Sequence, residues 1–180
     1  MFLNIITPCS RPENLRIISE SINIPKENYR WIVVYDGLNL ENKDLIPDNC
    51  EFYYHKNLNS KSGNDQRNFA LNLINNGHVY FNDDDTTLHP DLWENINNLT
   101  EDFIHFKQNN KNGTLRLHSE IIKVGHIDSH NFIVSNNIIG DHRWDIGKYD
   151  ADGYFAIECF NNSKSKIYIN KVLSIYNNLR

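Results

Sequence analysis

Short apolar runs recur along the first hundred residues, and more polar segments separate them. Residues 2–7 (FLNIIT), 30–37 (RWIVVYDG) and 78–83 (HVYFND) are rich in β-branched and aromatic residues, which is typical of buried strands. Residues 51–55 (EFYYH) form a shorter run of the same kind. We therefore predict four strands in this half of the chain.

Apolar residues recur at helical spacing between these runs. Residues 15–22 show this spacing and follow the segment SRPE, in which Ser10 and Glu13 are expected to form a capping box. Residues 64–77, which end on a glycine, and residues 89–99 show the same spacing. The resulting order of strand, helix and strand predicts an α/β fold.

The pattern changes near residue 100. An Asn-Gly pair at residues 112–113 separates two runs that predict a hairpin. The elements expected in this half are strands at 103–108, 114–118, 131–135 and 166–176, and a helix at 151–160. We find no internal repeat and no linker, so residues 1–180 are expected to form one domain with halves at 1–100 and 101–180.

Composition excludes several classes of function. The 39% of hydrophobic residues in 180 supply enough apolar surface for one core. A net charge of −5 with scattered basic residues argues against nucleic acid or an anionic membrane as a partner. No apolar run approaches a membrane span, and the start MFLNIITP is too short for a signal peptide.

Cysteine usage bears on the compartment. The three cysteines are odd in number and lack CxxC spacing, so they predict free thiols in a reducing environment. We therefore expect a cytoplasmic protein, either free or as the first domain of a longer polypeptide.

Polar side chains follow three of the predicted strands. In chain order these are Thr7, Pro8 and Arg11, then Asp36, and finally Asp83, Asp84 and Asp85. The carboxyl ends of parallel strands meet at one edge, where open α/β sheets bind ligands. Consecutive carboxylates repel one another unless a cation compensates them, and their hard oxygens suit Mg²⁺ or Mn²⁺. The sequence thus predicts a divalent cation that leaves positions for phosphate oxygens, with Arg67 adding positive charge.

Four ordered motifs carry a family resemblance. They are TP-x-x-RP at 7–12, VV-x-DG at 33–37, QRN-x-AL at 66–71 and YF-x-DDD at 80–85, and the segment DADGYF follows at 150–155. Together they resemble a GT-A glycosyltransferase of the family 2 kind. The first segments are also similar to those of animal β-1,3-glucuronyltransferases, and the compact layout resembles small viral glycosyltransferase domains. The resemblance implies a GT-A fold, with a mainly parallel central sheet flanked by helices and an antiparallel acceptor-side extension.

The resemblance implies donor-binding roles for the residues that match its motifs. Thr7, Pro8 and Arg11 would line the nucleotide pocket. Asp36 would receive uracil or another base, and Arg67 would reach the base or the diphosphate.

The DDD stretch matches the DxD motif of the family. By resemblance, Asp84 would touch the ribose, Asp85 would hold a metal that bridges the diphosphate, and Asp83 would be a neighbouring or indirect ligand. Transfer leaves a nucleoside diphosphate, whose growing charge a Mn²⁺ or Mg²⁺ ion and an arginine would stabilise. The implied activity is transfer of a sugar from a nucleoside diphosphate sugar, with UDP-sugars favoured, to the hydroxyl of a glycan or another acceptor.

An inverting transferase also needs a base for the acceptor hydroxyl. The resemblance places this base in the segment YDADGYF, where we favour Asp152 over Asp150, and Asp128 is the next candidate. His130 and Trp144 are candidates for acceptor binding, since sugar sites often pair carboxylates with aromatic platforms. The alternatives stay open: Asp152 as a helix cap, and His130 and Trp144 as core contacts.

The chain departs from the family pattern at one metal ligand, and two other functions are alternatives to sugar transfer. Many GT-A enzymes carry a late histidine as a metal ligand, whereas no histidine follows His142 here, and Tyr176 and Asn177 stand near the last strand instead. A sugar nucleotidyltransferase normally has a glycine-rich loop after its first strand, and TPCSRPEN contains no glycine. A catalytically inactive nucleotide-sugar or carbohydrate-binding domain of the same fold is the other alternative. The consecutive carboxylates do not match the alternating ligands of an EF-hand.

Overall fold

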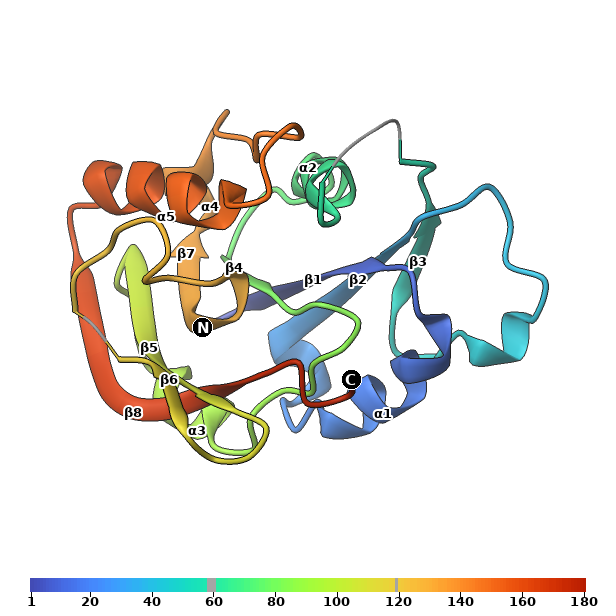
Figure 1. Cartoon of the computed structure of the whole chain (residues 1–180), viewed down its shortest axis with the longest axis horizontal. Helices are drawn as coiled ribbons and strands as arrows, with labels where there is room; N and C mark the ends of the chain where they lie inside the picture. Colours follow the sequence, from blue (N-terminus) through green and yellow to red (C-terminus); the bar gives the residue numbers. More distant parts are fainter. Residues whose placement is uncertain (58–60, 119) are drawn as a thin grey trace.

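The computed structural model describes residues 1–57, 61–118 and 120–180, and a mixed sheet with helices on both faces runs through them (Figure 1). The strands are β1 (Leu3–Cys9), β2 (Tyr29–Tyr35), β3 (Glu51–Tyr54), β4 (His78–Phe81), β5 (Phe103–Asn110), β6 (Leu115–Leu117), β7 (Phe132–Ser135) and β8 (Lys166–Tyr176). The helices are α1 (Leu15–Ser21), α2 (Asn64–Leu71), α3 (Leu92–Ile96), α4 (Asn136–Ile139) and α5 (Ala151–Asn162). Short 3₁₀ turns lie at Pro12–Asn14, Lys26–Asn28, Lys43–Leu45 and Ser129–Asn131.

The strand order is β3-β2-β1-β4-β7-β5-β6, and β8 pairs with β5. β1 runs parallel to β2, from the pair Leu3–Tyr29 to the pair Cys9–Tyr35, and it also runs parallel to β4. β2 and β3 are parallel as well. The predicted parallel first half is therefore confirmed, and the carboxyl ends of β1, β2 and β4 lie at one edge of the sheet.

The second half adds the antiparallel part. β7 runs antiparallel to both β4 and β5, and β5 and β6 form the expected hairpin. β8 returns parallel to β5. The predicted helix at 151–160 is present as α5. The α/β fold class is confirmed, with β4 and β7 as the seam between the two halves.

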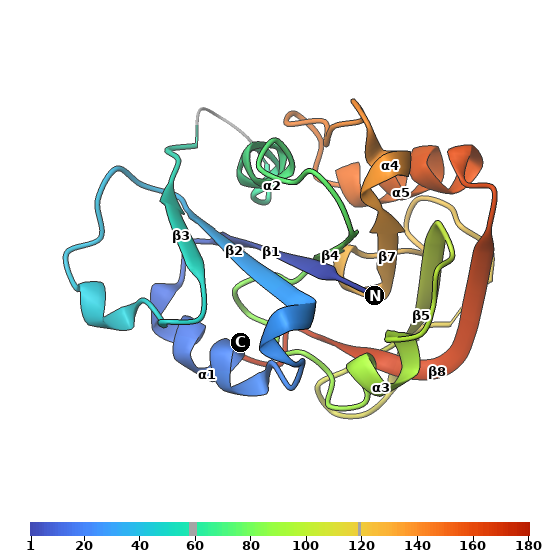
Figure 2. The ribbon, with the colours of Figure 1, turned by 180° about the vertical axis from the view of Figure 1, so that it is seen from behind.

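Two apolar layers cover the two faces of the sheet. One layer lies under α2, α4 and α5 and includes Ile6, Phe81 and Phe155, and the other lies over α1 and α3 and includes Ile5 (Figures 1 and 2). Ile5 and Ile6 belong to different layers because successive side chains of a strand point to opposite faces. The first layer also contains Phe103, so it joins both halves of the chain.

The segment between β1 and α1 differs from the prediction. The expected capping box of Ser10 and Glu13 is wrong: Arg11 precedes the 3₁₀ turn at Pro12–Asn14, and no side chain caps that turn. Ser10 instead donates its backbone N–H and its hydroxyl to Asp84. A long-range carboxylate thus replaces the local cap.

Two helices are shorter than their apolar spacing predicts. α2 ends at Leu71 rather than at Gly77, and the N–H groups of Leu73 and Ile74 bond carbonyls three residues back in tighter turns. α3 has five residues, although the apolar spacing extends from residue 89 to residue 99. Apolar spacing records which side is buried, and a tight turn can preserve that side after the α-helix has ended.

The structure also shows the state of the cysteines and the length of the helices. The described residues include all three cysteines, Cys9, Cys50 and Cys159, and each is a free thiol, as predicted. Within the described ranges, no helix combines the length and apolar character that crossing a membrane requires.

Candidate active site

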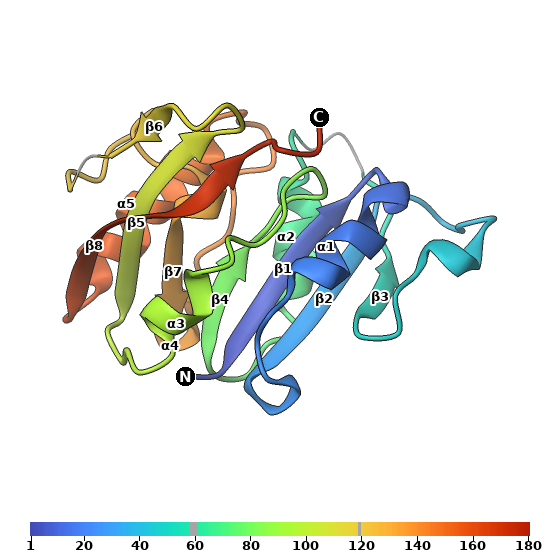
Figure 3. The ribbon, with the colours of Figure 1, turned by 90° about the horizontal axis from the view of Figure 1, so that it is seen from below.

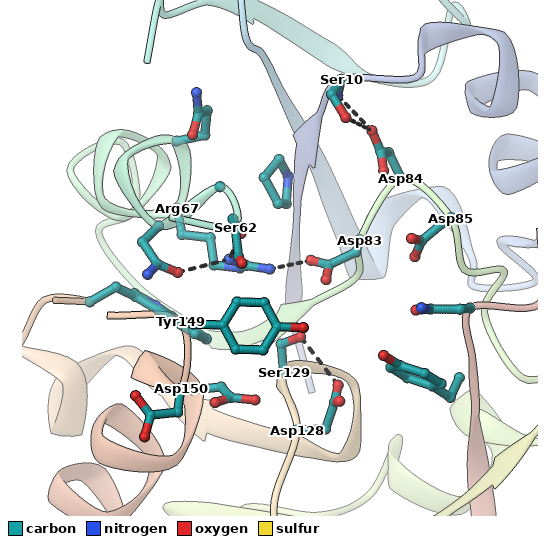
Figure 4. A pocket seen from close by; sticks show the side chains of 18 of the residues that line it. Ser10, Ser62, Arg67, Asp83, Asp84, Asp85, Asp128, Ser129, Tyr149 and Asp150 are labelled. Carbon is teal, nitrogen blue, oxygen red and sulfur yellow. Dashed lines mark hydrogen bonds and ion pairs between the residues drawn. The ribbon is translucent and has the colours of Figure 1, made fainter. Parts of the chain in front are cut away.

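A cavity of about 560 Å³ opens at the carboxyl edge of β1, β2 and β4 and reaches the start of α5 (Figure 4). The predicted site residues that line it are Pro8, Arg11, Asp36, Arg67, Asp83, Asp84, Asp85, Asp128, Trp144, Asp150 and Asp152. The cavity therefore brings together the predicted donor side and the predicted acceptor side.

The three consecutive aspartates point to separate partners, and Asp84 faces the loop after β1 (Figure 4). Its Oδ2 accepts hydrogen bonds from the backbone N–H of Ser10 at 2.5 Å and of Arg11 at 2.7 Å, and the Arg11 guanidinium binds Oδ1. Burial raises the pKa of Asp84 above its ordinary value, although these donors oppose the shift. Asp84 thus fixes the β1 loop against the end of β4.

Asp83 faces the opposite side, towards α2. Arg67 binds its Oδ1 through Nη2, and the Nε2 atom of His130 lies 3.2 Å from Oδ2. Burial alone would raise the pKa of Asp83, but the charges of Arg67 and His130 outweigh it and hold that pKa well below the ordinary range. Asp83 is therefore an ionised carboxylate with cationic partners of its own.

Arg67 is buried and is held by the loop that begins α2. Its Nη1 donates to the Ser62 carbonyl at 2.6 Å and to Asn64 Oδ1 at 3.1 Å. The guanidinium also lies over the Trp144 ring, 4.6 Å from the ring centre. Trp144 stacks on Phe155 at 4.9 Å, so much of its surface packs in the core even though it reaches the cavity.

Asp85 has the most buried side chain of the three aspartates, at 2% exposed. Its Oδ2 lies 3.2 Å from Arg11 Nη1 and 2.5 Å from Arg180 Nε. In the described part of the chain, no three acidic, histidine or cysteine side chains are grouped as a metal site would require. A nearly buried carboxylate with two guanidinium groups beside it has the negative charge that a bound metal cation requires. The residues therefore suit a divalent ion held by Asp85, with its other positions left to ligand oxygens.

Two residues predicted to contact ligands are buried away from the cavity. Thr7 is fully buried, and its Oγ1 accepts a hydrogen bond from Trp31 Nε1 at 2.9 Å. His130 is 1% exposed and lies between Asp83 and Asp128, with Nδ1 3.4 Å from Asp128 Oδ1. In this structure neither side chain has surface for a donor or an acceptor. Thr7 packs against the sheet, and His130 links two carboxylates.

Hydrogen bonds hold both the side chain and the backbone of Asp128. Its Oδ2 accepts a hydrogen bond from Arg116 Nη1 at 2.9 Å, and its Oδ1 accepts one from the His130 backbone N–H at 3.2 Å. The Asp128 N–H in turn donates to Asn131 Oδ1 at 2.8 Å, which completes a capping box on the 3₁₀ turn. These contacts favour a structural role for Asp128 over that of a base.

Asp152 differs from Asp128 in its electrostatics. It lies in the first turn of α5, its Oδ1 accepts a hydrogen bond from the Gly153 N–H at 2.8 Å, and within the described ranges it forms no ion pair. Burial, reinforced by the charge of Asp128, raises the pKa of Asp152 to about 6. Asp150 is exposed just before α5, and Figure 4 shows its carboxylate turned away from Asp83 and Asp128.

Sequence reasoning missed several residues of the cavity wall. They include Ser10, Ser62, Gly63, Asn64, Gln66, Arg116, Ser129, Tyr149 and Arg180. Tyr149 is 80% exposed, and Figure 4 shows its ring across the opening in front of Ser129. It belongs to the segment YDADGYF, so an aromatic residue beside a candidate base was the available signal. Arg180 gave no signal in the sequence.

Neither a protein-family model nor a curated protein sequence matches the chain. Solved structures do match. TarS 1–349 from S. aureus aligns with a TM-score of 0.78 at 16% identity, over 97% of this chain and 60% of that chain. Its complex with UDP-GlcNAc gives a TM-score of 0.77 at 16% identity, over 97% and 58%. The mannosyltransferase PcManGT from Pyrobaculum calidifontis, in complex with GDP-Man and Mn²⁺, gives 0.70 at 10% identity, over 97% and 56%.

The chain thus spans about 60% of the length of TarS 1–349. At these identities a structural match is informative about the backbone arrangement and not about the substrates. The topology, the strand-end cavity and these matches together show that the chain has the GT-A glycosyltransferase fold.

Proposed function

We propose that the chain is the catalytic domain of a glycosyltransferase that moves a sugar from a nucleoside diphosphate sugar, with UDP-sugars favoured, to a hydroxyl acceptor with inversion. One observation carries the proposal. Asp152, a carboxylate without a cationic partner in the described ranges and with a pKa raised to about 6, shares one cavity with the strand-end carboxylates. A base near neutrality and a charged ligand site are the two parts that this reaction needs.

The donor is expected on the β1, β2 and β4 side of the cavity. Asp36 is exposed at its rim, and its Oδ1 accepts a hydrogen bond from the Asn57 backbone N–H at 2.9 Å, which orients the carboxylate towards a nucleobase N–H. The solved complexes support this class of donor, because TarS binds UDP-GlcNAc and PcManGT binds GDP-Man in them.

Positive charge beside the diphosphate is the second requirement. When bound at Asp85, a divalent cation would supply charge to the leaving diphosphate. Arg11, which contacts both Asp84 and Asp85, adds a charge that is fixed before the substrate arrives. Pre-oriented charge of this kind costs no reorganisation during the reaction.

The acceptor is expected on the α5 side, between Asp152 and Tyr149. Asp152 would take the proton of the acceptor hydroxyl while the hydroxyl oxygen bonds to the anomeric carbon. The bond from that carbon to the diphosphate oxygen breaks in the same step, so the electron pair leaves with the diphosphate. The exposed Tyr149 ring offers an apolar face for a sugar acceptor.

The proposal is tested by screening UDP-, GDP- and TDP-sugars with Mn²⁺ for thermal stabilisation, followed by transfer assays on the donors that bind. We expect stabilisation by at least one donor, release of its nucleoside diphosphate in turnover, and a loss of the Mn²⁺ dependence of donor binding in Asp85→Asn. Donor binding without turnover on any acceptor would favour the catalytically inactive alternative. No stabilisation by any nucleotide sugar would contradict the proposal.

A further inference from the structure

The last residues of the chain are fastened to the loop that carries the three aspartates (Figure 3). The Leu179 N–H donates to the Asp85 carbonyl at 2.9 Å. Asn178 accepts a hydrogen bond from the Thr87 N–H at 3.0 Å and donates one to Thr87 Oγ1 at 2.7 Å. Leu179 also packs against the apolar layer on the α1 side. The backbone beside Asp85 is therefore held independently of any side-chain charge.

Arg180 extends from this anchored segment to Asp85. Its Nε lies 2.5 Å from Asp85 Oδ2, the same oxygen that Arg11 Nη1 approaches at 3.2 Å. The two guanidinium groups differ in how they are held. Arg11 also binds Asp84, and its side chain is 35% exposed, whereas the Arg180 side chain is 56% exposed. Arg180 is the cation that can leave Asp85 at the lower cost.

We propose that Arg180 is a displaceable counter-ion: it neutralises Asp85 in the empty protein, and a divalent cation must replace it at this carboxylate. The inference rests on the proposed cation at Asp85. A cation binds less tightly in the wild type because the ion pair between Arg180 and Asp85 must first be broken. The released guanidinium stays at the cavity wall, because its backbone is anchored. An anionic diphosphate can then take it as a partner, so cation and nucleotide each strengthen the binding of the other.

Mn²⁺ binding without nucleotide tests this directly, because free Mn²⁺ is measured by electron paramagnetic resonance and needs no turnover. Arg180→Gln should bind Mn²⁺ about fivefold more tightly than the wild type, the scale expected for removing a partly exposed ion pair. The tightening of Mn²⁺ binding by added UDP should be smaller in this variant than in the wild type. Arg180→Lys, which keeps the charge, should stay close to the wild type.

Arg16→Gln is the matched control, because it removes the same charge from the exposed face of α1, where Arg16 pairs with Glu20. Its Mn²⁺ affinity should equal that of the wild type. Unchanged or weaker Mn²⁺ binding by Arg180→Gln, or no Mn²⁺ binding by any of these proteins, overturns the inference. An Arg180 effect on Mn²⁺ in a protein that transfers no sugar would contradict the proposed function alone. Sugar transfer without the Arg180 effect would contradict this inference alone.

Discussion

Asp128 and Asp152 lie in one cavity, yet their surroundings prepare them for different chemistry. Arg116 and the His130 backbone N–H hold the Asp128 carboxylate, and the Asn131 side chain accepts from the Asp128 N–H. Asp152 instead has a neighbouring negative charge and one backbone N–H. Groups whose surroundings push their pKa values apart are the usual sign of an acid–base assignment. Asp152 is the better candidate for the base.

Asp152→Asn should lower the turnover rate by about 10²–10⁴-fold, the usual contribution of general-base assistance. Donor affinity should remain near that of the wild type, because the base acts as the transition state forms. Steady-state rates and donor titrations measure both quantities.

Asp150→Asn is the control, since Asp150 lies two residues away and is exposed. It should be much milder. A severe loss in Asp150→Asn beside an active Asp152→Asn would move the base to Asp150, and two active variants would leave Asp128 as the next candidate.

The pH dependence of kcat/KM should report Asp152 in the free enzyme. Its pKa is raised to about 6, so kcat/KM should fall about tenfold per pH unit below pH 6 and level off above it. The charged groups that act on this carboxyl are Asp128, Asp83 and Arg67. Arg116→Gln, which removes the cation from Asp128, should move the acid limb to higher pH. A limb that stays near pH 4 in the wild type would contradict the assignment.

The contribution of Asp152 to folding stability should change with pH in the direction opposite to that of kcat/KM. A carboxyl whose pKa rises from 3.8 to about 6 on folding binds its proton more tightly in the folded state. Its contribution to stability is therefore lost as the pH rises through this window. Asp152→Asn should accordingly be at least as stable as the wild type at pH 7, which separates a catalytic loss from a folding defect.

At the scale of elements, the start of α2 connects the fold to the site. Gly63 precedes the helix with a φ of 76°, and its carbonyl accepts the Arg67 N–H at 3.0 Å. A Cβ at Gly63 would lie 2.7 Å from Pro8 Cβ. Only glycine allows this left-handed conformation at such a close approach. The loop therefore sets the position from which Arg67 reaches Asp83.

Gly63→Ala should destabilise the protein by more than the roughly 1–2 kcal/mol expected for left-handed backbone strain alone. Gly113→Ala measures that strain by itself, because Gly113 has a φ of 82° and nothing within 4 Å of an added Cβ. Urea unfolding compares the two variants, and donor affinity should fall only in Gly63→Ala. Equal losses of stability would mean that the contact with Pro8 has no effect.

At the scale of the whole molecule, the two halves share one core and one seam. β4 of the first half pairs with β7 of the second, and Phe81 contacts both Phe132 and Phe155. The side chain of Asn68 on α2 also exchanges two hydrogen bonds with the Trp144 backbone. Both apolar layers contain buried residues from both halves.

Unfolding should therefore be a single cooperative transition. Two variants test this: one retains only Trp31, in the first half, and the other retains only Trp144, in the second. In each variant the urea transition measured by fluorescence should coincide with the one measured by circular dichroism. A fragment of residues 1–100 should not fold cooperatively, because β4 would keep β1 but lose β7 as its partner on the other side. A fluorescence midpoint that differs from the circular dichroism midpoint in either variant would show that the halves unfold independently.

The sequence alone determined the strands, the order of strand and helix, the parallel first half and the gathering of Pro8, Arg11, Asp36, Arg67 and the three aspartates at one edge. These features depend on local periodicity and on motif spacing, and both are properties of neighbouring residues. The helix ends were less predictable, because tight turns after Leu71 keep the same face buried.

Only the tertiary structure decided which way each carboxylate points and what it meets. Asp83, Asp84 and Asp85 are consecutive, yet they face α2, the β1 loop and the chain end. Their partners come from distant segments that the sheet topology brings together. For the same reason the sequence showed neither the burial of Thr7 and His130 nor the pairing of Arg180 with Asp85. Periodicity reports burial of a face, whereas contacts between distant side chains depend on the packing of the whole chain.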